Sequence, residues 1–451
     1  MGRLFGTDGV RDKANQGNMT VETVLRLGWA IARNFQHAED NEGVRPTIVI
    51  GRDPRLSGSM LESALAAGIC SAGVDVRLLG VVPTPAVAIL TRQSGAVAGI
   101  MVSASHNPFF DNGVKVFKGS GFKLSDDEEA RIEEWMDETG VVNPVGADVG
   151  TVFCLEDASA LYAAFCKNLF SEDKPLAGLK LVLDCANGAT SAVAPRIFEE
   201  LGAGVELIHH DPDGININEQ CGSQHTEDLR ARVVEVQADA GLAFDGDGDR
   251  LIVVDESGAE LTGDQILAIC AKASKEQGAL SNNLVVVTVM SNIGFHSAMK
   301  REGIATETAG VGDRKVMERM QQTGAVLGGE DSGHVIFLDC HTTGDGIVSG
   351  LKLLEVLQGS GVRLSALASV MKPYPQLLIN VDVRRKPPIE EVRGIMDALS
   401  RAEAELGPEG RVLIRYSGTQ PMCRVMVEGP TEEQTRAIAE RLAETVRECI
   451  G

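Results

Sequence analysis

The chain lacks any apolar stretch of the length that a membrane-spanning helix needs. No run approaches about 18 consecutive apolar residues, although hydrophobic residues make up 43% of its 451 positions. That hydrophobic content, beside 24% charged residues, is ordinary for a globular enzyme. We therefore exclude a membrane span and expect no membrane partner.

The chain also lacks an excess of basic residues. Asp and Glu outnumber Lys and Arg by 64 to 42, which gives a net charge of −22. A polyanion would be repelled at long range, so we expect no nucleic-acid partner. A small phosphorylated molecule can still be held by a local cluster of Arg side chains, backbone amides and a cation.

Paired cysteine motifs and a leader peptide are missing as well. The nine Cys are scattered and form no Cys-x-x-Cys pair, which predicts reduced, mostly buried thiols. The first residues show no charged-then-apolar signal pattern, and Gly6 stands where a myristoylation motif needs Ser or Thr. We therefore expect a cytoplasmic protein.

What the sequence does contain is a repeated alternation of strand and helix patterns. Its length exceeds what one hydrophobic core usually supports, and alternation of this kind predicts parallel sheets with right-handed crossovers. Beyond the linker Lys372 to Pro375 the order changes to that of a small α+β domain. We predict three consecutive similar α/β domains with mixed or parallel sheets and a smaller C-terminal α+β domain, with boundaries at 1–155, 156–255, 256–371 and 372–451.

A polar loop follows the apolar run Val97 to Val102, which has the pattern of a buried strand. The loop presents Ser105, His106 and Asn107 together, and open α/β sheets bind ligands beyond the carboxyl ends of their strands. The alternative is a Ser- and Asn-rich turn whose side chains bond only their own backbone.

Three carboxylates follow a second predicted strand, at Asp245, Asp247 and Asp249 with single glycines between them. Such a cluster is costly without a cation, because like charges a few ångströms apart repel. The hard ion that suits this set is Mg²⁺. An EF-hand fits poorly, since Arg250 stands where that loop requires Gly, and an unliganded acidic turn is the other alternative.

Two further loops carry groups suited to a phosphorylated sugar. In the first, 328–334, glycines bring the backbone near a ligand, and Glu330 and Ser332 can bond sugar hydroxyls. The second combines guanidinium groups, hydroxyls and a Gly amide, which is good chemistry for an oxyanion; its residues are Arg415, Ser417, Gly418, Thr419 and Arg424. Alone, the first loop is equally compatible with an ordinary Gly-rich turn, and the alternative for the second is a β-hairpin turn with exposed Arg. His209, His210 and His341 we expect to be loop residues rather than ligands.

Taken together, these strings resemble the signature loops of the α-D-phosphohexomutases along the whole chain. The 104–108 string with Lys115 resembles the family's phosphoserine loop, and 245–249 is close to identical with its metal loop. The N-terminal string resembles the motif whose Arg, here Arg11, reaches into the active site. Several positions depart from the family pattern: Asp12, Gln224, Lys315, Asp331, Tyr416 and Gln420.

The resemblance implies four domains around a central cleft, each supplying one active-site loop. Within the family it is greatest to members that interconvert glucosamine 6-phosphate and glucosamine 1-phosphate for amino-sugar nucleotide and cell-wall precursor synthesis. Activating phosphorylation on Ser105, a 1,6-bisphosphate intermediate that also serves as primer, and one Mg²⁺ per chain are then implied. The expected ligands of that ion are a Ser105 phosphate oxygen and Asp245, Asp247 and Asp249.

The remaining roles follow from the same resemblance. Lys115 and Arg250 are expected to stabilise the transferring phosphoryl group, while Lys115, His106 or another nearby His moves the proton. His334 and Arg11 join the substrate-binding set. The chain is expected to be a monomer or a homodimer. The rival interpretations are a phosphomannomutase or phosphoglucomutase of the same superfamily, and a sugar-phosphate-binding protein that has lost catalysis.

Overall fold

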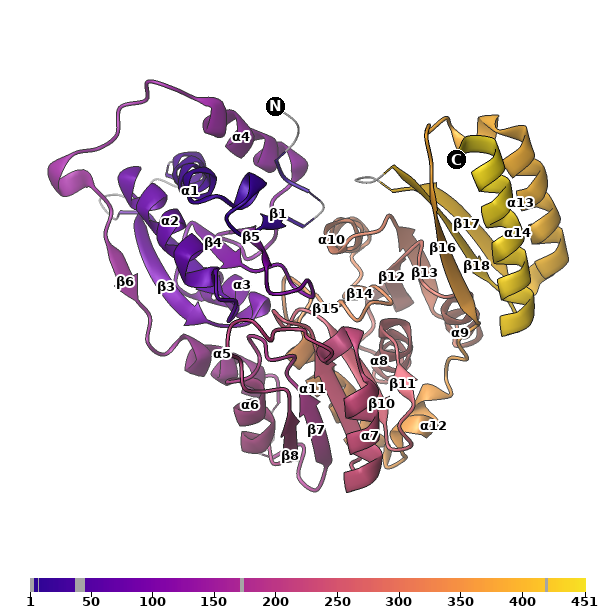
Figure 1. Ribbon diagram of the computed structural model, residues 1–451. Helices are drawn as coiled ribbons and strands as arrows, with labels where there is room; N and C mark the ends of the chain where they lie inside the picture. Colours follow the sequence, from indigo (N-terminus) through magenta and orange to yellow (C-terminus); the bar gives the residue numbers. More distant parts are fainter. Residues whose placement is uncertain (1–3, 7, 37–44, 171–173, 418–420) are drawn as a thin grey trace. The chain divides into compact units, whose positions relative to one another are not determined.

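The computed structural model describes residues 4–6, 8–36, 45–170, 174–417 and 421–451. These residues form two compact units, Met1–Val289 with Ile304–Ala368, and Met290–Gly303 with Ser369–Gly451. Each unit has its own sheets and buried apolar side chains (Figure 1). The boundaries of the four domains expected from the sequence remain a prediction.

The first sheet has six strands in the order β1-β5-β4-β2-β3-β6. Strands β2, β3, β4 and β6 are parallel, as the sequence predicts, but β1 and β5 join as antiparallel strands at one edge. The strands are β1 (Val10–Lys13), β2 (Thr47–Arg52), β3 (Asp75–Val81), β4 (Ala98–Val102), β5 (Asp111–Lys118) and β6 (Val152–Cys154). The helices are α1 (Val21–Phe35), α2 (Gly58–Ser71), α3 (Thr84–Gln93) and α4 (Asp126–Asp137).

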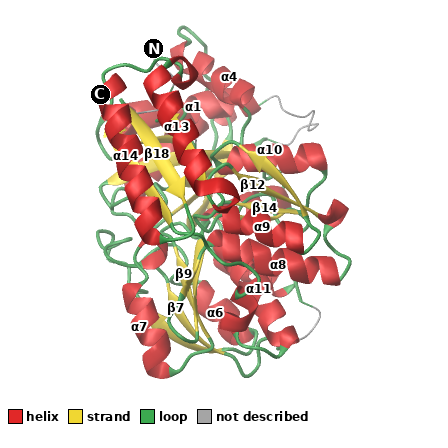
Figure 2. Cartoon of the chain, turned by 90° about the vertical axis from the view of Figure 1, so that its right-hand side faces the viewer, coloured by secondary structure: helices red, strands yellow, loops and turns green. Residues whose placement is uncertain are grey.

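The second sheet has five strands in the order β11-β10-β9-β7-β8. Helices α6 and α7 lie on opposite sides of β7 and β9 (Figure 2). The strands are β7 (Lys180–Asp184), β8 (Gly204–Ile208), β9 (Ala240–Phe244), β10 (Leu251–Asp255) and β11 (Glu260–Leu261). The helices are α5 (Ala158–Lys167), α6 (Ala194–Glu200) and α7 (Glu227–Val236), with the short 3₁₀ helix η3 (Gly222–Gln224).

The third sheet has four strands in the order β13-β12-β14-β15. Its middle strands are fully buried, and the longer of them is rich in Val, which is typical of a sheet covered on both faces. The strands are β12 (Leu284–Thr288), β13 (Ala305–Ala309), β14 (Leu327–Gly329) and β15 (Val335–Phe337). The helices are α8 (Gly263–Glu276), α10 (Asp313–Thr323), α11 (Gly346–Ser360) and α12 (Leu364–Ala368).

One structural feature repeats in all three sheets. In each sheet, one strand has a parallel neighbour on one side. The next strand in the chain pairs antiparallel with that same strand on its other side. The turn between these two strands leaves the carboxyl end of the parallel strand, where open α/β sheets bind ligands. This turn is the Ser105 loop in the first sheet and the loop that carries Asp245, Asp247 and Asp249, here called the triple-Asp loop, in the second. In the third sheet it is the 328–334 loop.

The second compact unit is an antiparallel sheet in the order β16-β18-β17 with α13 and α14 on one face. It also includes α9 (Ile293–Arg301), whose first backbone N–H donates to Glu428 Oε2 at 2.9 Å. A 3₁₀ turn, Ile389–Glu391, precedes α13, which begins at Arg393. The elements are β16 (Gln376–Asp382), α13 (Arg393–Leu406), β17 (Arg411–Tyr416), β18 (Met422–Glu428) and α14 (Glu432–Ile450).

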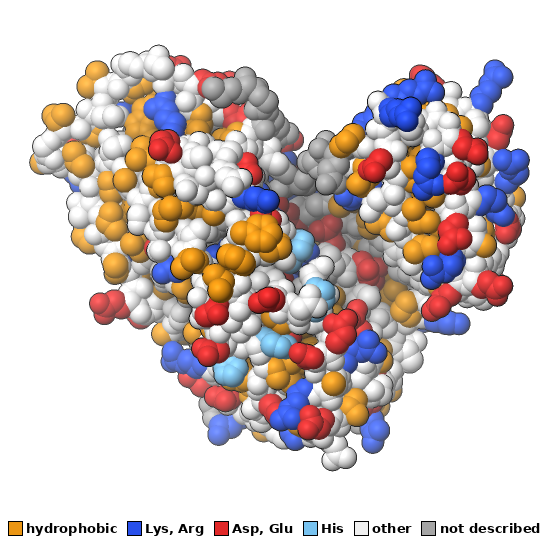
Figure 3. Space-filling model, in the orientation of Figure 1, with side chains coloured by type: hydrophobic (Ala, Val, Ile, Leu, Met, Phe, Trp, Pro, Cys, Tyr) orange, Lys and Arg blue, Asp and Glu red, His pale blue; other side chains and the backbone are white. Residues whose placement is uncertain are grey.

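The charged surface side chains, the cysteine thiols and the apolarity of the helices agree with the composition. On the face shown in Figure 3, acidic and basic side chains are interspersed over the C-terminal unit. All nine Cys are free, and five of them are buried. Within the described part of the chain, no helix combines the length and apolarity needed to cross a bilayer.

Candidate active site

The Ser105 loop joins β4 to β5 and holds its serine in a left-handed backbone conformation. Ser105 has φ of 54°, and its backbone N–H donates to the Ser103 hydroxyl at 2.9 Å. A residue other than Gly in this conformation costs free energy and persists only where its surroundings fix it, as they often do at functional sites. The strained backbone therefore indicates that the surrounding structure fixes the position of the Ser105 side chain.

A buried guanidinium group provides much of that constraint. Arg55 donates from Nη2 to the backbone carbonyls of Ser105 and Asn107, at 2.9 and 2.8 Å, and from Nη1 to that of Asp111 at 3.1 Å. Its Nε donates to Asp53 Oδ2 at 2.9 Å. Because the guanidinium is planar with donors in a fixed fork, one side chain sets the course of the whole loop. The sequence analysis assigned Arg55 no role.

The three aspartates converge at the end of β9. One carboxylate oxygen from each lies within 4.8 Å of the other two, and all three side chains are buried. Asp247 Oδ1 and Asp249 Oδ1 are buried and accept no hydrogen bond among the described residues. Unsatisfied buried carboxylate oxygens are costly, and a hard divalent cation is the partner that suits them. The residues therefore fit Mg²⁺.

The strands on either side decide against the EF-hand alternative. The triple-Asp loop lies between β9 and β10, which pair antiparallel from Phe244 opposite Leu251 to Ala240 opposite Asp255. An EF-hand loop is flanked by helices. The loop is therefore a β-hairpin turn, and its glycines let it approach the first domain: a Cβ on Gly246 would lie 2.7 Å from the Ser105 carbonyl oxygen.

The nucleophile candidate and the metal candidate meet directly. Ser105 Oγ donates a hydrogen bond to Asp245 Oδ2 at 2.6 Å, although 140 residues separate the two in the chain. Burial, together with the neighbouring charges of Asp249 and Asp247, raises the pKa of Asp245 well above its usual value. The two loops from different sheets therefore form one site.

Lys115, on β5, lies at the centre of the acidic cluster. Its ammonium is 2.8 Å from Asp247 Oδ2, 2.9 Å from Asp249 Oδ2 and 3.2 Å from Asp8 Oδ2. Burial alone would lower the pKa of Lys115, but the three carboxylates outweigh it and raise the pKa well above its usual value. The same ammonium holds the pKa of Asp249 well below its usual value, against the effect of burial. Lys115 is thus a fixed cation beside the Ser105 hydroxyl.

Two imidazoles border the cluster. His106 Nδ1 lies 3.4 Å from Ser105 Oγ, and burial, with the charges of Arg250 and Arg11, lowers the pKa of His106 to about 4. His334 Nδ1 lies 3.7 Å from Asp249 Oδ1. Burial would lower the pKa of His334, but the carboxylates of Asp249 and Asp313 outweigh burial and raise this pKa overall.

Two arginines complete the basic side of the site. The backbone N–H of Arg250 donates to Asp245 Oδ1 at 3.2 Å, and Arg250 Nε, which is buried, has no hydrogen-bond partner among the described residues. Arg11 Nη1 donates to the Ala104 carbonyl at 3.5 Å, directly before the serine, and its Nη2 pairs with Asp8. Both guanidinium groups therefore belong to the Ser105 site.

Residues without a local sequence signal extend this network. The Lys123 ammonium contacts both Asp8 and Asp313, so a row of alternating charges runs from the third sheet to Lys115. Asn218 Nδ2 donates to the carbonyls of Ser105 and Asn107, at 3.0 and 3.1 Å. Their partners lie more than a hundred residues away, so no spacing in the sequence could have indicated them.

The 328–334 loop lies between β14 and β15 and is held by its own backbone. Glu330 Oε1 accepts from the Gly312 N–H at 3.1 Å, while Ser332 is half-buried. Asp331, a departure from the family pattern, accepts hydrogen bonds from the Thr262 hydroxyl and the Asp264 backbone. Asp331 therefore caps the start of α8, and its carboxylate is occupied in that contact.

The phosphate-binding candidates lie in the second compact unit. Arg415 and Arg424 stand directly opposite each other on β17 and β18, so two like charges share one face of the sheet. Burial and the charge of Arg424 lower the pKa of Arg415, and Arg424 Nε is buried without a partner among the described residues. The Tyr416 hydroxyl donates to the Pro387 carbonyl at 2.7 Å. Ser417 is buried, whereas Gly418, Thr419 and Gln420 lie outside the described residues.

Known proteins resemble the chain along its whole length. Four family models match in order, described as phosphoglucomutase/phosphomannomutase α/β/α domains I, II and III and C-terminal domain, at residues 2–141, 160–258, 262–374 and 378–445. A phosphoglucosamine mutase of Syntrophus aciditrophicus is 52% identical, covering 100% of both chains. One of Syntrophobacter fumaroxidans is 51% identical, also over 100% of both chains.

Solved structures share the fold. A phosphoglucomutase/phosphomannomutase family protein of Burkholderia thailandensis matches with a TM-score of 0.82 and 25% identity, covering 99% of this chain and 97% of that one. An N-acetylphosphoglucosamine mutase of Aspergillus fumigatus matches with a TM-score of 0.64 and 18% identity, covering 99% and 96%. With four domain models in order and full-length relatives at about half identity, the chain belongs to the phosphoglucomutase/phosphomannomutase family and is a mutase most similar in sequence, among these proteins, to phosphoglucosamine mutases.

Proposed function

We propose that the chain interconverts glucosamine 6-phosphate and glucosamine 1-phosphate through a phosphoserine at Ser105 and a 1,6-bisphosphate intermediate. The substrate follows the names of its full-length relatives, which are phosphoglucosamine mutases at 52% and 51% identity. The observation that carries the mechanism is the 2.6 Å contact between Ser105 Oγ and Asp245 Oδ2. It places a hydroxyl beside a carboxylate cluster that fits a divalent cation.

One Mg²⁺ per chain is part of this proposal. Asp245, Asp247 and Asp249 would hold it together with a phosphate oxygen on Ser105. When bound, the ion would offset negative charge on the transferring phosphoryl group. A bisphosphate primer, glucosamine 1,6-bisphosphate or a similar compound, would load Ser105 for the first turnover.

The fixed cations have a separate task in the transfer. Lys115 and Arg250 contact Asp247 and Asp249 of the cluster whose third member, Asp245, accepts from Ser105, so a phosphoryl group there would have positive charge on several sides. Arg11, which contacts the carbonyl before the serine, adds a third. The sugar hydroxyl must lose its proton as it attacks, and Lys115, His106 and His334 are the candidate carriers.

The phosphate of the bisphosphate intermediate that does not react needs a binding site that accepts both orientations of the sugar. Arg415, Ser417, Gly418, Thr419 and Arg424 are our candidates. The paired guanidinium groups of Arg415 and Arg424 repel each other unless an anion lies between them, which favours phosphate over no ligand. Glu330, Ser332 and His334 would contact the sugar ring. We place the reaction in the cytoplasm, with the enzyme a monomer or a homodimer.

The test is a substrate panel with the full chain, Mg²⁺ and bisphosphate primer. We expect the highest kcat/KM on glucosamine phosphate and lower values on glucose and mannose phosphates. A preference for mannose or glucose phosphate would instead favour a phosphomannomutase or phosphoglucomutase. Saturable binding without turnover would reject catalysis altogether.

The phosphoserine is tested separately. Intact-mass analysis should find some chains heavier by one phosphoryl group, and Ser105→Ala should remove both that mass and turnover while keeping the fold. Ser94→Ala, at the end of α3 and away from the site, is the matched control. Full activity in Ser105→Ala would contradict the mechanism.

A further inference from the structure

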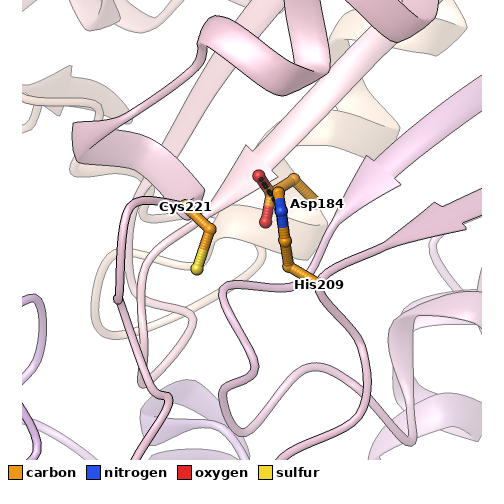
Figure 4. Close-up of side chains that lie close together, drawn as sticks. All are labelled: Asp184, His209 and Cys221. Carbon is orange, nitrogen blue, oxygen red and sulfur yellow. Dashed lines mark hydrogen bonds and ion pairs between the residues drawn. The ribbon is translucent and has the colours of Figure 1, made fainter.

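A second cluster of ligating side chains lies on the same sheet as the triple-Asp loop (Figure 4). Asp184 ends β7, His209 directly follows β8, and Cys221 directly precedes η3. One ligand atom from each lies within 4.8 Å of the other two. Asp184 and Cys221 are buried, whereas 25% of the His209 side chain is exposed. Three different donor types therefore meet at one edge of the sheet.

A fourth side chain fixes how the imidazole is presented. His209 Nδ1 lies 2.9 Å from Asp184 Oδ2, and its Nε2 lies 3.3 Å from Asp228 Oδ2 on α7. When Nε2 carries its proton toward Asp228 and Nδ1 has lost its own, Nδ1 can bind an ion together with Asp184 and Cys221. A histidine that binds a metal through one nitrogen and donates from the other to a carboxylate is the usual arrangement in metal sites.

The Asp184 carboxylate shifts the pKa of both other side chains in the cluster. The hydrogen bond to Asp184 outweighs partial burial and raises the pKa of His209. Burial and the charge of Asp184 raise the pKa of the Cys221 thiol to about 12. A divalent ion would take the place of both protons, because metal ligands bind as neutral imidazole and as thiolate.

The donor set selects the kind of ion. Mg²⁺ takes oxygen ligands and is reluctant to lose its waters, so a thiolate and an imidazole do not suit it. Zn²⁺ takes Cys, His and Asp ligands together, usually four in a tetrahedron. We propose that Asp184, His209 and Cys221 form a zinc site separate from the triple-Asp site, with a water as the fourth ligand on the exposed side of His209.

The position of this site gives the ion a structural role. Asp184 Oδ2 also accepts from the Gly222 N–H at 3.0 Å, so the carboxylate already ties β7 to the far end of the 209–222 segment. That segment carries Asn218, which donates to the carbonyls of Ser105 and Asn107. An ion joining Asp184, His209 and Cys221 would close the segment at both ends and steady its contact with the Ser105 loop.

The test titrates zinc into the full chain in excess Mg²⁺, which occupies the oxygen-only site, with a chromogenic chelator as competitor. We expect one tightly bound zinc per chain. Cys221→Ser and His209→Asn should each weaken zinc binding by at least about tenfold, and Asp228→Asn, a positioning residue, by about 10- to 100-fold. Cys154→Ser and His210→Asn are matched controls, an exposed thiol and the adjacent imidazole, and should leave the affinity unchanged.

Cobalt substitution reports the ligand type in the unmodified protein. A thiolate ligand gives a cobalt charge-transfer band in the near ultraviolet, which the sulfur-free triple-Asp site cannot produce. We expect this band in the wild-type chain and in Cys154→Ser, and its loss in Cys221→Ser. Absence of the band from the wild type, or zinc affinity that Cys221→Ser and His209→Asn leave unchanged, would overturn the proposal even if one variant folded poorly.

Discussion

At the scale of single residues, Arg55 shows how a side chain away from the chemistry can control it. Arg55→Lys keeps the charge but loses the planar fork that holds the carbonyls of Ser105 and Asn107. A displacement of the serine by about 1 Å can cost about 10²-fold in rate. We therefore expect kcat/KM to fall by about two orders of magnitude, with a folded far-ultraviolet circular dichroism spectrum.

The neighbouring Arg52 is the matched control for that variant. Its Nε pairs with Glu62 at 3.2 Å, on a helix, and not with the Ser105 loop. Arg52→Lys should keep near wild-type kcat/KM. Equal losses in the two variants would mean that any replacement of Arg by Lys beside α2 lowers turnover, and that the hold of Arg55 on the Ser105 loop is not the cause.

This contrast also marks what the sequence can reveal about a residue. Ser105 and the three aspartates stand in short local strings whose chemistry is visible without a structure. Arg55 binds mostly backbone carbonyls, and any residue type can supply a carbonyl, so its partners leave no trace in the sequence. The same holds for Asn218, whose two acceptors are carbonyls more than a hundred residues away.

A buried histidine makes the stability depend on pH. His341 donates from Nε2 to the Pro85 carbonyl and accepts at Nδ1 from the Thr343 N–H, so both nitrogens are satisfied only in the neutral ring. Burial lowers the pKa of His341 to about 3. The unfolded chain binds this proton near pH 6.5, so this histidine makes the free energy of unfolding fall as the pH drops from about 6.5 toward about 3.

His341→Gln tests that dependence, because Gln also offers a donor and an acceptor but does not titrate. Between about pH 6.5 and pH 4 the wild type should take up about one more proton on unfolding than the variant. Urea unfolding followed by tryptophan fluorescence at several pH values measures this. Parallel pH profiles for the two proteins would show that His341 is not responsible.

At the scale of secondary structure elements, Asp331 adds to the capping of α8, whose N-cap residue is Thr262. Its carboxylate accepts from Thr262 and Asp264 at the start of α8, and loss of such a cap costs about 0.5–2 kcal/mol. We expect Asp331→Ala to lower the free energy of unfolding by about 1 kcal/mol and to leave KM unchanged. Asp331→Asn, which keeps an acceptor oxygen, should cost less; a large rise in KM for either variant would argue for direct substrate contact.

The elements that the sequence analysis missed are those whose pairing is set by tertiary contacts. Asn112 and Gly113 have the composition of a turn, yet they lie in β5 and pair with β1. A Cβ on Gly113 would lie 2.7 Å from the Ser103 carbonyl oxygen, so the Gly marks a close approach of two backbones. Helices α7 and α10 bury only two and three apolar side chains respectively, so their apolar pattern is weak in the sequence. The parallel strands were predictable, since their continuous Val and Ile runs are typical of buried strands.

At the scale of the whole molecule, the net charge of −22 includes three aspartates that are buried together at the end of β9 and whose side chains only partly find partners. Burial and repulsion raise the pKa of Asp245, so without a cation the folded chain disfavours the charged form of this one carboxylate. Asp245→Asn removes one charge while an amide can still meet Ser105 and Arg250. In EDTA we therefore expect the variant to unfold at a higher Tm than the wild type.

Adding Mg²⁺ should reverse that order. An ion that binds only the folded chain stabilises it by about 2.7 kcal/mol at a hundred times its Kd, and the variant would lack one of the three proposed carboxylate ligands. Asp397→Asn, on the exposed side of α13, removes the same charge elsewhere and should respond to Mg²⁺ as the wild type does. If Asp245→Asn were less stable than the wild type in EDTA and gained as much from Mg²⁺, the repulsion would be no cost to the fold. The three clustered carboxylates repel one another in the empty site, and the same charges would attract a cation to the position beside Ser105. The cost to stability and the affinity for the ion therefore have one cause.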